Sequence, residues 1–106
     1  MESIINNPMA LFAREAPEAA KAFDCLVNAV RQSTGIDEKT KHLIYISIKA
    51  VLGDTTAVHY HVPMAKKLGA SRDEIKDAIL ITLTVCGLQA VANCLPLALE
   101  IFDNPI

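Results

Sequence analysis

Aromatic side chains are scarce in this chain of 106 residues, and tryptophan is absent. Phe and Tyr together make up 5% of the sequence, although 52% of it is hydrophobic. The apolar volume therefore comes mostly from Ala, Val, Leu and Ile, which suit closely packed helices. A monomer of this size hides only about 65% of the surface that its unfolded chain exposes. So much apolar sequence predicts that copies of the chain bury part of it against each other.

An excess of basic residues is also lacking. The net charge of −2 and the pI near 5.8 argue against a nucleic-acid partner, because phosphate binding needs a basic face. The three cysteines are an odd number with no paired spacing, which argues against a disulfide framework and favours a reducing, cytoplasmic location. The N-terminal MESIINNPMA has no charged segment followed by a long apolar run, so we expect no secretory signal.

One uncharged run, from Ala78 to Leu99, is long enough to span a bilayer. However, it contains several polar side chains, a glycine and a proline, and no cluster of basic residues flanks it. Two buried helices that meet at Gly87 are the better interpretation. We therefore expect no membrane partner.

Glycine and proline positions divide the chain into helical segments, and no strand pair or hairpin turn is persuasive. A capping box at Ser71 to Glu74 begins a helix whose apolar stripe extends to Cys86. The alternating IYISI is also typical of a strand, but the helical spacing of its apolar neighbours favours a helix. We expect the other helices over residues 8–14, 17–33, 38–52, 55–68 and 88–102, with bends at Pro63 and Pro96. The sequence thus predicts a single all-α domain over residues 1–106, with about five to six helices.

Three blocks of the sequence resemble the carboxymuconolactone decarboxylase and AhpD-like superfamily over residues 37–102: TKHLIYISIKAVLG, YHVPMAKKLGASRDEIKDAI and VCGLQAVAN. The resemblance implies an AhpD-like helical domain that assembles as a trimer or as a hexamer. It also implies one of two activities. Decarboxylase-like members are lyases that perform acid–base work on a small carboxylated lactone, whereas AhpD-like members are peroxiredoxin-like enzymes with a Cys-x-x-Cys pair.

The redox members of this superfamily are similar in carrying a Glu, the Cys-x-x-Cys pair and a His at fixed spacing. When that pattern is anchored on His61, the cysteine positions fall on Asp54 and Ala57, and the glutamate position falls on His42. Neither Asp nor Ala can form the mixed disulfide on which the redox mechanism depends. The resemblance therefore supports the fold and disfavours a thiol peroxidase.

The remaining cysteines do not replace the missing pair. Cys86 and Cys94 are eight residues apart, about 12 Å along one helix, which is beyond the reach of a disulfide. We expect each of them to be a small buried apolar residue. A lone peroxidatic thiol at Cys86 is the alternative.

The turn at Gly53 is expected to bring polar side chains together. On antiparallel neighbouring helices, His42 lies about 16 Å before the turn and His61 about 12 Å after it, so their rings can meet. In one interpretation, His61 is a general acid or base that Asp54 or His42 orients. Tyr60 would donate a hydrogen bond to a substrate oxygen. The protein would then be a lyase that needs no cofactor and acts on a small carboxylated or lactone substrate.

Two other interpretations stay open. His42, His61 and Asp54 could bind a divalent metal, although their spacing is not a known ligand motif. Alternatively, Asp54 is only a helix N-cap, His61 packs under Pro63 and His42 lies on an exposed first turn. The protein would then be a non-catalytic, oligomeric binding or scaffold protein with an apolar ligand between its helices.

We expect the purified protein to be a homo-oligomer, because its apolar content exceeds what one small subunit can bury. Light scattering should give three or six times the 11.5 kDa mass of one chain. A measured mass of one subunit would exclude the assembly.

Overall fold

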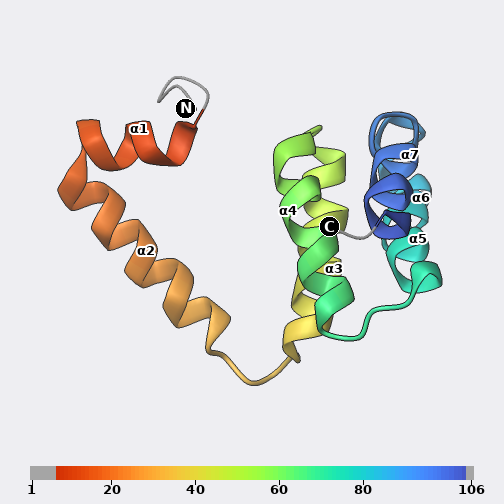
Figure 1. The fold of residues 1–106 in the computed structure, drawn as a ribbon, viewed down its shortest axis with the longest axis horizontal. Coiled ribbons are helices and arrows are strands. Elements are labelled where there is room, and N and C mark those ends of the chain that lie inside the picture. Colours follow the sequence, from red (N-terminus) through yellow and green to blue (C-terminus); the bar gives the residue numbers. More distant parts are fainter. Residues whose placement is uncertain (1–6, 105–106) are drawn as a thin grey trace. The chain divides into compact units, whose positions relative to one another are not determined.

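The computed structural model describes residues 7–104, and every regular element in that range is a helix (Figure 1). The all-α prediction is therefore confirmed. Most of the N-terminal stretch used to argue against a secretory signal lies outside the described residues. In chain order the helices are α1 (Pro8–Glu15), α2 (Pro17–Arg31), α3 (Glu38–Val51), α4 (Thr55–Lys67), α5 (Arg72–Leu80), α6 (Leu83–Cys86) and α7 (Gln89–Asp103).

The chain forms two compact units, one that ends at Gly35 and one that begins at Ile36. The first unit contains α1 and α2, and within it the ring of Phe12 packs edge-on against that of Phe23, with 6.2 Å between centroids. The second unit contains α3 to α7 and carries all the candidate site residues. The single domain over residues 1–106 stays a prediction.

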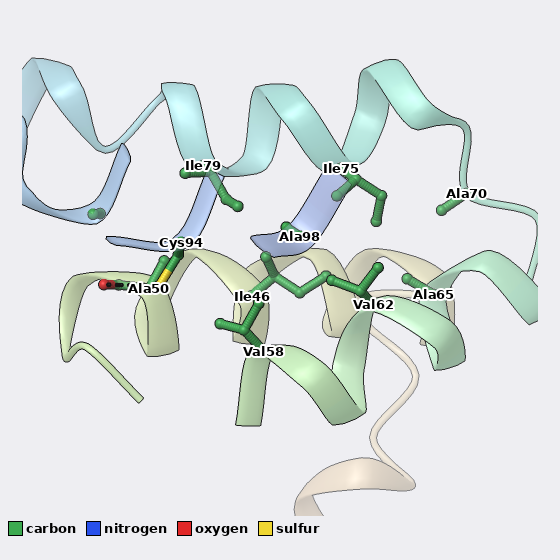
Figure 2. Packing of buried hydrophobic residues seen from close by; sticks show 11 residues of the cluster. Ile46, Ala50, Val58, Val62, Ala65, Ala70, Ile75, Ile79, Cys94 and Ala98 are labelled. Atoms are coloured by element: carbon green, nitrogen blue, oxygen red, sulfur yellow. Dashed lines mark hydrogen bonds between the residues drawn. The ribbon is translucent and has the colours of Figure 1, made fainter. Parts of the chain in front are cut away.

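The core of the second unit is built from small aliphatic side chains on α3, α4, α5 and α7 (Figure 2). No aromatic ring is among its buried members in the described residues, as the composition leads one to expect. Side chains this small let the helix backbones approach closely. The fully buried members are Ile46, Val58, Val62, Ala65, Ile75, Ile79, Cys94 and Ala98.

The short connection between α3 and α4 fixes the pairing of these two helices. Gly53 has a left-handed φ of 72°, which ends α3, and the Asp54 side chain accepts the N–H of Ala57 to begin α4. The predicted cap at Asp37 and the capping box of Ser71 with Glu74 are also present. Caps of this kind are local signals that can be recognised in the sequence. α3 and α4 begin at the predicted residues, and each ends one residue earlier than predicted.

The prediction that one helix with a buried apolar stripe continues from the capping box to Cys86 is wrong beyond Leu80. α5 ends at Leu80, and the hydroxyl of Thr82 donates to the carbonyl oxygen of Ile79 at 2.6 Å. Such a side-chain bond competes with the helical ladder. Val85 is consequently 86% exposed, and Cys86 is exposed as well rather than buried.

The uncharged run from Ala78 to Leu99 is divided between α5, α6 and α7. Gly87, with a φ of 75°, separates α6 from α7. Within residues 7–104, no helix combines the length and the apolar character needed to cross a membrane. α4 and α7 both run on through their prolines, Pro63 and Pro96.

We expect Gly53→Ala to lower the free energy of unfolding by about 1–2 kcal/mol, because an L side chain is strained at a left-handed φ. Gly35→Ala is the matched control, since Gly35 has open space around it and no left-handed φ. This control should leave stability unchanged or slightly raised. Denaturant unfolding of both variants measures the difference, and equal effects would contradict the role assigned to Gly53.

Candidate functional site

Two histidines face each other between α3 and α4. The Nδ1 atom of His42 lies 3.0 Å from the Nδ1 atom of His61, which is hydrogen-bonding distance. Their ring centroids are 5.2 Å apart, and the ring planes meet at 46°. Because an imidazole nitrogen either donates or accepts, one Nδ1 carries the proton and the other receives it. The two rings thus meet across the Gly53 turn, as their distances along the helices indicate.

The two imidazoles differ in their exposure to solvent. His42 is only 7% exposed, whereas His61 is half-buried. The alternative expectation that His42 lies on an exposed first turn is wrong, because it lies in the second turn of α3 and α4 packs over that face. Two positive rings at this distance and with this burial would repel each other. The two Nδ1 atoms are therefore suited to share the single proton that lies between them.

Two tyrosine rings contact the histidine pair. Tyr45, one turn after His42 on α3, has its centroid 5.1 Å from that of His61 at an angle of 37°. It also meets His42 edge-on, at 6.0 Å and 78°. Tyr60, which is 56% exposed, packs edge-on against His61 at 5.1 Å. Sequence reasoning missed Tyr45, although its spacing of three residues from His42 places it on the same helix face.

Asp54 has the contacts of a helix cap. Its Oδ1 accepts the N–H of Ala57 at 3.0 Å, and its Oδ2 lies 3.4 Å from Nζ of Lys49. Lys49 belongs to the last turn of α3 and Ala57 to the first turn of α4, so the carboxylate is occupied in joining the two helices. Among residues 7–104, no three His, Cys, Asp or Glu side chains are arranged to hold a metal ion.

The cysteines occupy different environments. Cys94 is fully buried, as expected, with its Sγ 3.9 Å from the carbonyl oxygen of Ala50. Burial, followed by the nearby charge of Asp54, raises the pKa of the Cys94 thiol. Because the thiolate is the reactive form, Cys94 is held in its inert form. Cys25 and Cys86 are exposed and form no disulfide.

We expect Asp54→Asn to leave the protonation of His61 unchanged, because Asn caps helices as well as Asp does and the contacts of Asp54 lie elsewhere. Asp54→Ala should instead lower stability by about 1 kcal/mol. An NMR titration of the imidazoles and a denaturant curve test the two statements. A midpoint of His61 that moves by one pH unit or more in Asp54→Asn would show about 1.4 kcal/mol of coupling and contradict a pure cap.

Comparisons with known proteins identify the family of the chain. The model of the carboxymuconolactone decarboxylase family matches residues 17–100, which include α2 as well as the helices that hold His42 and His61. The uncharacterized protein MJ1511 of Methanocaldococcus jannaschii is 26% identical over 88 residues, which cover 83% of this chain and 82% of that protein. No solved structure matches the chain. Because the family model matches most of its length, the chain belongs to the carboxymuconolactone decarboxylase family.

Proposed function

We propose that the His42–His61 pair is the acid–base site of a lyase that needs no cofactor and acts on a small carboxylated or lactone substrate. The observation that carries this proposal is the 3.0 Å contact between the two Nδ1 atoms. An imidazole titrates near neutral pH, so it can both take up and release a proton under ordinary conditions. The substrate class comes from the family to which the chain belongs.

His61 is the general acid or base in this proposal, and His42 is its positioning residue. His61 is the more exposed of the two, so a substrate would reach it first. Since its Nδ1 faces His42, Nε2 is the atom that exchanges a proton with the substrate. When His61 donates through Nδ1, Nε2 has a lone pair and acts as a base; when Nδ1 accepts, Nε2 carries the proton and acts as an acid.

The second imidazole performs the task that a carboxylate performs in other acid–base sites. A proton gained at Nε2 of His61 leaves a positive ring, whose Nδ1–H bond to His42 is then charge-assisted and stronger. We assign Asp54 to the helix cap instead of this role, because of its contacts with Ala57 and Lys49. Tyr60 is the candidate donor to a substrate oxygen, since its exposed ring packs against His61.

A second candidate function, that of an oligomeric binding or scaffold protein, is favoured by the apolar surface of the second unit. Large hydrophobic side chains are exposed along α3 and around α6: Ile44, Ile48, Leu52, Ile81, Val85 and Leu88. Water contact with this much apolar surface is unfavourable. We therefore propose a homo-oligomer for this protein, in which the subunits cover part of that surface, whichever of the two functions it has.

We expect His61→Gln to lower kcat at least about 100-fold on any substrate found among small carboxylic acids and lactones, because general acid–base catalysis contributes about 10²–10⁴-fold. His59→Gln is the matched control, since His59 is an exposed histidine on the same helix. It should keep the activity of the unmodified protein. Release of carbon dioxide or opening of the lactone ring measures turnover.

The same assays separate the alternatives. Equal losses in His61→Gln and His59→Gln would contradict the proposed site. Cys86→Ser should keep the acid–base activity, because the proposed reaction uses no thiol. Turnover of an alkyl hydroperoxide that Cys86→Ser abolishes would support the peroxidase interpretation instead.

A further inference from the structure

Tyr45 is in contact with both members of the histidine pair. Neither the Asp54 cap nor the proposed proton transfer gives this tyrosine a role. The three rings form a closed triangle, with centroid distances of 5.2 Å between the histidines, 5.1 Å from Tyr45 to His61 and 6.0 Å from Tyr45 to His42. His42 and Tyr45 come from one turn of α3, and His61 comes from α4. The His61 ring therefore contacts two rings that are held by a single turn of α3.

A single hydrogen bond at one nitrogen does not by itself fix the orientation of the imidazole ring. The χ2 torsion of histidine is broad and roughly two-fold, and a half-turn about it exchanges Nδ1 with the Cδ2 carbon. In the turned ring, a C–H group of His61 would face His42 and the hydrogen bond between the rings would be lost. A flat ring lying at 37° against the imidazole resists this turn, because the edge of His61 would have to sweep through the space of Tyr45.

We propose that Tyr45 is a positioning residue that holds the His61 ring with Nδ1 toward His42 and thereby presents Nε2 to the substrate. This inference rests on the proposed acid–base role of the pair. Tyr45 acts through its ring, since its contacts with both histidines are contacts between rings. Tyr60 does not have this role, because it meets His61 only edge-on, at 82°, and is 56% exposed.

The test compares Tyr45→Phe, which keeps the ring, with Tyr45→Leu, which removes it. Nitrogen chemical shifts of uniformly labelled protein report which nitrogen of each imidazole carries the proton, and a pH series follows the uptake of protons. In the unmodified protein and in Tyr45→Phe, we expect one tautomer of His61 and two proton-uptake steps for the pair, more than about one pH unit apart. In Tyr45→Leu, we expect a mixture of the two tautomers of His61 and two proton-uptake steps whose midpoints lie within about one pH unit of each other.

Tyr60→Leu is the matched control, because it removes the other tyrosine ring beside His61. It should keep the single tautomer and the separated steps. Tyr45→Met provides the ring-less variant if Tyr45→Leu does not fold, as judged by circular dichroism.

Three results would overturn the inference: a Tyr45→Leu protein that keeps the single tautomer, a Tyr45→Phe protein that loses it, or an equal loss in Tyr60→Leu. The measurement uses no substrate. A chain that orders the pair as described but turns over nothing would therefore contradict the proposed function alone, so the two failures are distinguishable.

Discussion

The packing of α3 against α4 is the interaction on which the second unit depends. Ile46 on α3 and Val58 and Val62 on α4 are fully buried between these helices and their neighbours (Figure 2). Because these side chains are aliphatic and β-branched, they have few rotamers and hold the two helices in one register. The same register brings two imidazoles to hydrogen-bonding distance, so the site is a product of the core rather than of a mobile loop.

The side chains at the α3–α4 turn decide which chemistry these two helices can perform. A thiol pair at the start of α4 would transfer electrons, whereas Asp54 at the same place closes a helix. This chain has instead a polar contact between the second turn of α3 and the middle of α4. With histidine on both sides of it, that contact is suited to moving protons and unsuited to redox exchange.

The helices and the meeting of His42 with His61 were predictable, because caps, glycines and residue counts are local properties of the sequence. The burial of His42 was not, since it depends on which face of α3 the next helix covers. The break after Leu80 escaped prediction for a related reason: the hydroxyl of Thr82 can bond to its own turn or leave the ladder intact, and the pattern of apolar residues favoured the latter. Tyr45 had the right spacing but carried no signal that distinguished it from a core aromatic residue.

The small number of aromatic residues gives the molecule one further property. The chain has two tyrosines and no tryptophan, and both tyrosines lie against the same imidazole. The near-ultraviolet emission of the protein therefore originates almost entirely beside His61. The native chain carries its own optical reporter at the candidate site, and no fluorescent label has to be introduced there to observe it.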